Sequence, residues 1–266
     1  MKIMGILNVT PDSFSDGGRY FDTTSALDHA HQMVQDGAHI IDVGGESTRP
    51  GSARVGEEEE QRRVLPVVTE LAKQGIAVSV DTMNASTMRA CLEAGAQYIN
   101  DVSAGQMDPD MLRLAAETHS EIILMHWRGL LSDAGAVFHY DDVVEDVRAE
   151  LTQRVDAAVD AGVNPGRIIV DPGLGFSKNA QHNWTLMSHL DRLVSIGPRL
   201  LVAGSRKRFL SSHLEETAAE VDERNLDTAT SALTALACHA RAWGVGVHDV
   251  RTSAVVASVT ERVLND

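Results

Sequence analysis

The sequence predicts an α/β fold, a single (β/α)8 TIM barrel with its active site at the C-terminal ends of the strands. Three observations predict it: a length of 266 residues, short apolar segments that alternate with amphipathic helical ones, and glycines at the junctions from helix to strand. Barrels of this kind have about 250 residues and eight βα units. A doubly wound sheet is the alternative, but it usually has fewer strands and a GxGxxG turn, which this sequence lacks.

Short segments rich in Ile, Val, Leu and Met are the predicted strands. Their apolar residues are nearly continuous rather than alternating, which is typical of parallel strands covered on both faces. In chain order, the eight predicted strands are Ile3–Leu7, His39–Val43, Ala77–Val80, Tyr98–Asn100, Ile122–Met125, Ile168–Val170, Leu200–Ala203 and Gly246–His248.

The segments between these strands have helical patterns that end in glycine. The first predicted helix, Ser25–Gln35, has Asp22 or Thr23 available as an N-cap. Its predicted apolar face consists of Ala26, Ala30, Met33 and Val34. Glycine adopts the left-handed conformation that stops a helix, after which the chain turns into a strand. Such junctions are Asp36-Gly37, Gln74-Gly75, Ala94-Gly95 and Ala161-Gly162.

Composition excludes several classes of protein. The chain has 23 Lys and Arg against 38 Asp and Glu, and its formal charge of −15 disfavours binding to nucleic acid or to an anionic membrane surface. Cys91 and Cys238 form no CxxC pair, which argues against a metal ribbon, a disulfide scaffold or a dithiol redox site. No apolar run reaches the roughly 20 residues that span a bilayer, and no signal-peptide pattern is present. We therefore expect a cytoplasmic protein with one domain, residues 1–266.

Polar residues follow every predicted strand, where the catalytic groups of such barrels lie. Any one of them could be an ordinary helix cap. A whole ring of them predicts instead a polar site that handles anions. The ring consists of Asn8, Asp42, Glu46, Asp81, Asn100, Asp101, His126, Asp171, Ser205-Arg206-Lys207 and His248-Asp249.

Four segments after strands carry further signals. Segments 8–18 and 44–51 are long and contain Phe14 and Arg49, which suggests contacts made on closure over a ligand. The cationic segment 205–208 stands at a predicted helix start, where free N–H groups also favour a phosphate or carboxylate. The fourth segment, 171–176, places glycines after a carboxylate and ends in Phe176. Phe176 could stack on a flat ring, although a packing role is as common. No phosphate-loop, HExxH or GxSxG motif is present, and the histidines lack the spacing of a zinc site.

Seven segments together resemble the dihydropteroate synthase family, and the resemblance extends from Ile3 to about Val259. It implies the condensation of 6-hydroxymethyl-7,8-dihydropterin diphosphate with 4-aminobenzoate, giving 7,8-dihydropteroate and pyrophosphate in folate biosynthesis. It also implies a magnesium cofactor, a homodimer and a target of sulfonamides. The segments are MGILNVTPDSFSDGG (4–18), DVGGESTRPG (42–51), SVDTM (79–83), YINDVS (98–103), DPGLGF (171–176), SRKRF (205–209) and VHDVR (247–251).

The resemblance also assigns roles to residues. Lys207, Asp81 and Asp16 are implied as catalytic, and the family's counterpart of Asp16 orders the closed state. Asn8 resembles the magnesium ligand, and His248 joins it in binding the diphosphate. The pterin would be held by Asp81, Asn100, Asp171 and Lys207, with Phe176 beside it. The aminobenzoate site would be shaped by Phe14, Thr48, Arg49, Pro50 and Ser205.

Two positions depart from the family pattern. Gly246 stands where the family carries an Arg that helps to hold phosphate, so we expect pyrophosphate binding either to be weaker here or to be supplied from elsewhere, with Arg206 and Arg251 as the candidates. Ala203-Gly204 stands where the family more often has Gly first. Gly246 keeps open the alternative of a non-catalytic paralogue that binds pterin without turnover. A pterin-dependent methyltransferase is a third hypothesis, which the two long segments and segment 205–207 disfavour.

Overall fold

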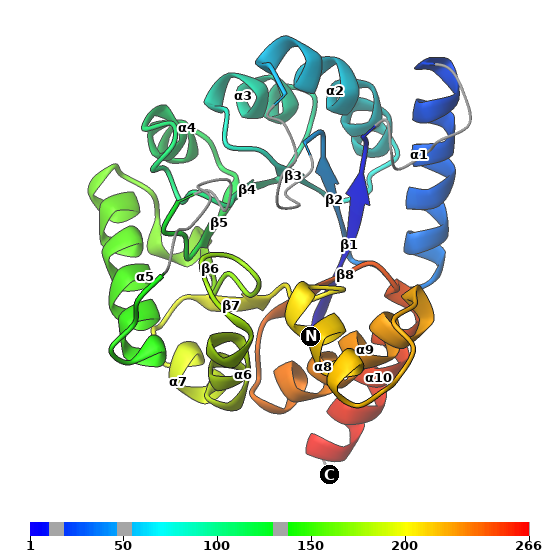
Figure 1. The fold of residues 1–266 in the computed structure, drawn as a ribbon. Coiled ribbons are helices and arrows are strands. Elements are labelled where there is room, and N and C mark those ends of the chain that lie inside the picture. Colours follow the sequence, from blue (N-terminus) through cyan, green and yellow to red (C-terminus); the bar gives the residue numbers. More distant parts are fainter. Residues whose placement is uncertain (11–18, 47–54, 130–137, 266) are drawn as a thin grey trace.

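The computed structural model describes residues 1–10, 19–46, 55–129 and 138–265. Eight parallel strands close into a barrel in chain order, and the last strand pairs with the first. Figure 1 looks along this barrel and shows the helices arranged around the strands. The predicted (β/α)8 fold is therefore confirmed. The strands are β1 Lys2–Asn8, β2 Ile40–Gly44, β3 Val78–Asp81, β4 Tyr98–Asp101, β5 Glu121–Met125, β6 Ile168–Asp171, β7 Arg199–Val202 and β8 Gly244–Val247.

The helices of the described residues fill the connections between strands. They are α1 Arg19–Gln35, α2 Glu57–Lys73, α3 Ala85–Glu93, α4 Asp110–Glu117, α5 Val143–Asp160, α6 Ala180–Ser188, α7 Leu190–Val194, α8 Arg208–Glu216, α9 Glu223–His239 and α10 Val250–Leu264, with a short 3-10 turn at Pro165–Arg167. Cys91 in α3 and Cys238 in α9 are buried free thiols. None of the helices in the described ranges is long and apolar enough to cross a membrane.

The first helix corrects two sequence predictions. It begins at Arg19, so Asp22 and Thr23 lie inside it and neither is its N-cap. Val34 is 38% exposed and does not belong to the buried face, which Ala26, Ala30 and Met33 form.

The predicted glycine junctions are confirmed. Gly37, Gly75, Gly95 and Gly162 all have positive φ values between 74° and 109°. This left-handed conformation ends the preceding helix and sends the chain directly into the next strand.

The alternation of side chains along each strand separates two apolar regions. One set of strand residues, such as Ile3 and Leu7, packs under the helices in the main core. The other set fills the barrel interior, where Met4, Ile40, Ile123, Ile169 and Leu201 form a separate cluster. Since strand side chains alternate with a period of two, residues further along each strand in the same register also face inward. At the C-terminal ends several of these inward residues, among them Asn8, Asp42 and Asp171, are polar, and they form the floor of the candidate site.

Candidate active site

The strand register brings Asn8, Asp81 and Asn100 to one level of the barrel. Asn8 pairs with Gly44, Gly44 with Asp81, and Asp81 with Asn100. Gly44 has no side chain, and a Cβ there would lie 3.7 Å from Asn8 Oδ1 and 3.7 Å from Asp81 Oδ2. The polar atoms of Asn8 and Asp81 therefore face the same space above Gly44.

Two carboxylates, the buried Asp42 and the partly buried Asp81, lie on this floor, on neighbouring strands. Asn100 Nδ2 donates to Asp42 Oδ2 at 3.0 Å, while Asp42 Oδ1 has no hydrogen-bond partner among the described residues. Burial raises the pKa of Asp42, although the neighbouring Ser79 hydroxyl and the bond from Asn100 oppose the shift. Burial and the charge of Asp42 raise the pKa of Asp81 well above its usual range, and Lys207 opposes this. These carboxylates are poised to pair with hydrogen-bond donors of a ligand.

Lys207 contacts an aromatic ring and interacts electrostatically with two carboxylates. Its ammonium is 4.1 Å from the centre of the Phe176 ring, a cation–π contact. Burial lowers the pKa of Lys207, and the charges of Asp171 and Asp81 oppose that shift. A Cβ on Gly175 would lie 2.9 Å from Lys207 Cδ, so the loop that follows β6 packs tightly against the aliphatic part of the lysine side chain. Four of the residues that the resemblance assigns to pterin binding thus lie together: Asp81, Asp171, Phe176 and Lys207.

Asp171 ends β6 and caps the loop that follows. The N–H of Gly173 donates to Asp171 Oδ1 at 2.6 Å. Burial raises the pKa of Asp171 to about 6, even though this bond and Lys207 favour the charged form. At neutral pH the group is largely ionised and able to accept hydrogen bonds.

Ser205 and His248 join the loops after β7 and β8. The Ser205 hydroxyl lies 2.9 Å from His248 Nδ1 and accepts the backbone N–H of His248 at 3.2 Å. These residues, which the resemblance assigns to different substrates, are therefore neighbours at the rim.

Arg206 does not take the place of the missing Arg at position 246. Arg206 pairs with Asp227 on α9, with its Nε 2.7 Å from Oδ1, and lies 3.3 Å from Glu223. Arg251 is an exposed residue of the first turn of α10. The expectation that Arg206 serves the anion site is not supported, because its guanidinium is held by these carboxylates.

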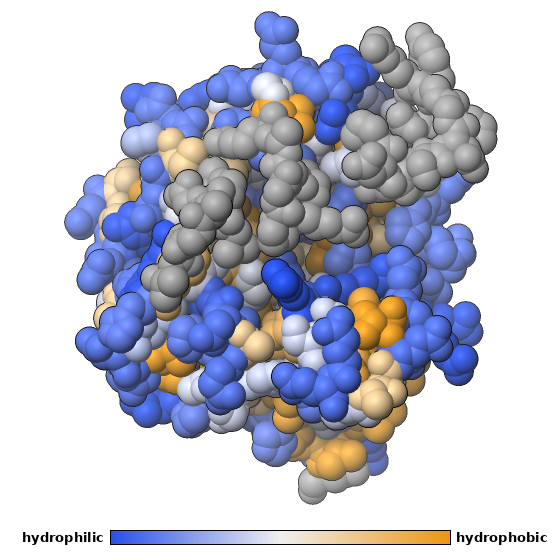
Figure 2. Space-filling view, viewed as in Figure 1, coloured by the Kyte–Doolittle hydropathy of each residue, from blue (hydrophilic) through white to orange (hydrophobic). Residues whose placement is uncertain are grey.

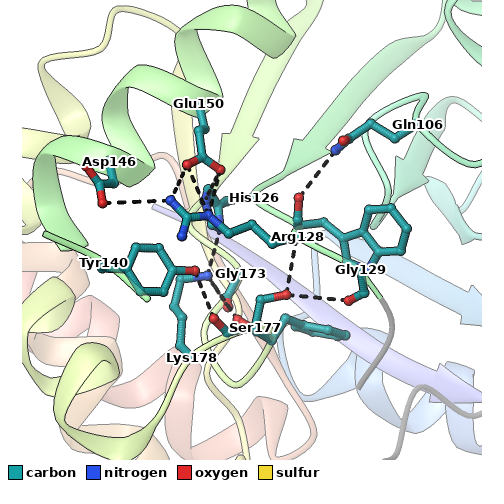
Figure 3. Close-up of polar contacts among 12 residues, drawn as sticks. Gln106, His126, Arg128, Gly129, Tyr140, Asp146, Glu150, Gly173, Ser177 and Lys178 are labelled. Atoms are coloured by element: carbon teal, nitrogen blue, oxygen red, sulfur yellow. Dashed lines mark hydrogen bonds and ion pairs between the residues drawn. The ribbon is translucent and has the colours of Figure 1, made fainter. Parts of the chain in front are cut away.

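Three members of the expected polar ring have structural roles. Asp101 accepts from the backbone N–H groups of Ser103 and Gly105 and shapes the turn after β4. Asp249 caps α10 by accepting from Thr252 N at 3.1 Å. His126 is buried and lies 3.1 Å from Glu150 on α5, within a network with Arg128 and Lys178 that Figure 3 shows.

An apolar group missed by the sequence analysis lies beside the polar floor. Met83, Val102 and Met125 form a small buried cluster, and Trp127 and Phe176 pack against it. Such a surface suits the flat face of a ring whose edge is held by carboxylates. The inward register of Met125, which pairs with Asp171, is the signal that would have found it.

The remaining predicted site residues lie outside the described ranges. They are Phe14, Asp16, Thr48, Arg49 and Pro50.

The donor set around Asn8 is compatible with magnesium on a diphosphate. Among the described residues no group of three or more His, Cys, Asp and Glu could hold a metal ion alone. Magnesium in phosphate sites is usually held by one or two protein oxygens together with phosphate oxygens and water. Asn8 Oδ1, with Asp81 across Gly44, provides such a partial set.

Comparison with known proteins identifies similar chains. The family described as "Pterin binding enzyme" matches residues 4–248. A dihydropteroate synthase of Mycobacterium leprae is 50% identical over 257 residues, covering 95% of this chain and 90% of that protein. The Xanthomonas albilineans dihydropteroate synthase solved with 4-aminobenzoic acid has a TM-score of 0.91 and 40% identity, over 100% of this chain and 93% of that one. The Yersinia pestis enzyme in a sulfonamide complex has a TM-score of 0.91 and 38% identity, over 100% and 94%.

Proposed function

This chain belongs to the pterin-binding enzyme family, among its dihydropteroate synthases, and from that premise we propose how its residues perform the reaction. The enzyme is a transferase of folate biosynthesis. It joins 6-hydroxymethyl-7,8-dihydropterin diphosphate to 4-aminobenzoate and releases pyrophosphate with 7,8-dihydropteroate. It also belongs to the group of enzymes that sulfonamides bind, as the Yersinia pestis complex illustrates.

The pterin edge is held by the polar floor. A dihydropterin presents adjacent N–H donors and a carbonyl acceptor, which carboxylates and the Asn100 amide can pair. Asp171 accepts in its ionised form, and the Lys207 ammonium is stabilised by the charges of both Asp171 and Asp81. Asp42 Oδ1, which is without a partner among the described residues, adds a further acceptor. Analogues that lack a donor leave a buried acceptor unpaired, at a cost of about 1–3 kcal/mol per group.

Reaction requires the C–O bond at the pterin methylene to break before or as the amine attacks. Loss of pyrophosphate leaves positive charge delocalised into the pterin ring, which the buried carboxylates stabilise. The departing diphosphate lies toward Asn8 and the rim residue His248. Asn8 would hold magnesium, and the ion would supply positive charge to neutralise the leaving diphosphate. The neutral arylamine then attacks the methylene carbon and loses its proton afterwards, so no general base is assigned.

The second substrate is proposed to bind beside Ser205. This assignment rests on the resemblance for Phe14, Thr48, Arg49 and Pro50, and on the closeness of Ser205 to His248. In this arrangement the amine approaches from the rim, opposite the polar floor. Asp16 is proposed to order the closed state, in which exclusion of water protects the cation from hydrolysis.

The observation that carries the proposal is the convergence of Asp81, Asp171, Phe176 and Lys207 at one end of the barrel. The test is release of pyrophosphate from the pterin diphosphate with Mg²⁺, with and without 4-aminobenzoate. We expect release that depends on 4-aminobenzoate, formation of dihydropteroate, and a severe loss of turnover in Lys207→Ala. Pterin binding without any release would instead support the non-catalytic paralogue that Gly246 suggested. The relatives give no support to the methyltransferase hypothesis.

A homodimer built on the barrel helices is also proposed. Val255, Val259 and Val263 recur every four residues on α10 and are 61%, 61% and 71% exposed. Leu236 on the adjacent helix α9 is 50% exposed, and Figure 2 shows hydrophobic residues at the lower edge, where α10 lies in Figure 1. Such a stripe favours a second copy as its cover. Val259→Asp should yield monomers in sedimentation equilibrium at concentrations where the parent is dimeric, and an unchanged mass would exclude this face.

The cytoplasmic location stays a prediction that cell fractionation would test.

A further inference from the structure

Lys178, two residues beyond Phe176, uses every donor of its ammonium group within the protein. Nζ contacts Gly173 O at 3.1 Å, Phe176 O at 3.0 Å and His126 Nδ1 at 2.9 Å, and Figure 3 shows Lys178 directed toward Gly173 and His126. An ammonium has three N–H donors and no acceptor, so the three partners match it completely. Burial lowers the pKa of Lys178 to about 7, while the charges of Asp171 and Glu150 oppose that shift and favour the ammonium form.

The third partner, His126, is held in one protonation state. Because Lys178 donates to Nδ1, the ring is neutral and carries its proton on Nε2, which faces Glu150 Oε2 at 3.1 Å. Burial and the charge of Lys178 lower the pKa of His126 to about 4. Arg128 donates to both oxygens of Glu150 and fixes that carboxylate in turn. The chain of contacts thus runs from α5 through the end of β5 to the β6 loop.

The β6 loop, residues 171–178, has a backbone that needs restraint. Gly173 and Gly175 have φ values of +66° and +79°, and Ser177 has +48° without being glycine. A Cβ on Gly173 would lie 2.3 Å from the carbonyl oxygen of His126, so the loop is pressed against the β5 end. The Tyr140 hydroxyl donates to Ser177 O at 2.8 Å and holds the far end of the loop. Left-handed residues in succession persist only where the surroundings fix them.

The restrained carbonyls belong to the residues that form the pterin site. Gly173 also donates its N–H to Asp171, and Phe176 carries the ring that faces the Lys207 ammonium. A shift of either carbonyl would move the Asp171 carboxylate or the Phe176 ring relative to Lys207. Lys178 itself lies behind this loop, bonded to backbone oxygens and to His126.

We propose that Lys178 is a positioning residue, whose ammonium, oriented through His126 and Glu150, holds the β6 loop in the shape that binds the pterin substrate. The proposal rests on the proposed function for its substrate and deepens it by naming what builds the pterin half of the site. The proposal predicts different effects on the two substrates, because Lys178 contacts the loop that carries the pterin residues and none of these contacts is with Ser205.

The test is steady-state kinetics of Lys178→Met, which keeps the length of the stem and removes all three hydrogen bonds. We expect the KM for the pterin diphosphate to rise at least tenfold, since several bonds to the loop are lost, while the KM for 4-aminobenzoate stays within about twofold. The matched control is Lys73→Met on α2, where the lysine side chain is 68% exposed, and it should change neither constant. Far-UV circular dichroism and a thermal melt establish that each variant is folded.

Three outcomes decide the matter. A folded Lys178→Met enzyme with an unchanged pterin KM, or with both KM values raised equally, overturns the proposal. If Lys178→Met does not fold, Glu150→Gln decides instead: a rise of about threefold or more confined to the pterin KM supports the proposal, and an unchanged pterin KM overturns it. If the parent shows no turnover, the proposed function fails, and calorimetry of the pterin diphosphate with the parent and Lys178→Met still tests the positioning role through the Kd.

Discussion

Gly246 and Ala203, the two departures from the family pattern, are in contact, and we predict that they are energetically coupled. A Cβ built on Gly246 would lie 3.1 Å from the Cβ of Ala203 and 3.9 Å from Ile6 Cδ1. Carbon atoms pack best at about 3.5–4.0 Å, so any side chain at position 246 overlaps the Ala203 methyl group. Restoring an arginine at position 246 alone is therefore expected to strain the barrel rather than simply to add a cation.

The magnitude follows from the overlap. Overpacking of this kind costs about 1–3 kcal/mol, and the contact is short by only a few tenths of an ångström, so we expect about 1–2 kcal/mol for Gly246→Arg. Ala203→Gly alone should cost about 0.5–1 kcal/mol through backbone entropy. The double variant should lose about 1 kcal/mol less unfolding free energy than the two single variants lose together, because the glycine at position 203 removes the overlapping methyl group.

The assay is urea unfolding of the parent, the two single variants and the double variant, completed by Gly246→Ala, which isolates the methyl overlap from the arginine charge. The same proteins are used to measure the KM for the pterin diphosphate. If the site lacks a cation, this KM should fall more in the double variant than in Gly246→Arg. Stabilities that add within about 0.3 kcal/mol would refute the coupling, and a KM equal to that of the parent in the double variant would show that another cation already serves the diphosphate.

Three further predictions concern protons and metal. His126 is buried and its pKa is lowered from 6.5 to about 4, so its contribution to stability is present above pH 6.5 and lost as the pH falls toward 4. Urea unfolding should show that the free energy of unfolding falls between pH 7 and pH 5 by about 2 kcal/mol more in the parent than in His126→Gln. Equal decreases in the two proteins would contradict the buried neutral ring. Asp171, with a pKa of about 6, must be ionised to accept from the pterin, so calorimetry should show weaker binding below pH 6 in the parent but not in Asp171→Asn, which binds more weakly throughout. Chelation of Mg²⁺ should abolish turnover, and Asn8→Ala should raise the Mg²⁺ concentration for half-maximal activity by about tenfold, whereas an unshifted titration would place the ion elsewhere.

The strands were predictable because parallel strands buried on both faces are continuous apolar runs. Their ends were less so. Lys2 extends β1 and Gly244 begins β8, and neither a charged residue nor a glycine marks a strand from its own preference. Helix α1 begins at Arg19, several residues before its apolar face. The sequence did not predict this start, because Asp and Thr in its first turns are weak helix formers and resemble N-caps.

The polar floor was predictable in part, because strand register is a short-range property. Residues that end neighbouring parallel strands come level, so Asn8, Asp81 and Asn100 were placed correctly at one end of the barrel. His126 also follows a strand, but its partner Glu150 lies on α5, and no pattern in the sequence couples the two. Lys178 was missed for the same reason, since its acceptors are backbone oxygens that converge only once Gly173 adopts a left-handed turn.

Burial of like charges explains why this site needs support from behind. Asp42 and Asp171 are buried and Asp81 is partly buried. Loss of solvation raises the pKa of each, because it disfavours the ionised carboxylate. Lys207 is a cation that interacts with Asp81 and Asp171, and its own pKa is lowered by burial. A ligand that brings several N–H donors recovers this cost only if the carboxylates stay fixed, because a mobile site would relax around water instead. Strands fix Asp42, Asp81 and Asp171, whereas Phe176 and the Gly173 N–H that orients the Asp171 carboxylate belong to a loop, which is where the contacts of Lys178 and His126 are concentrated.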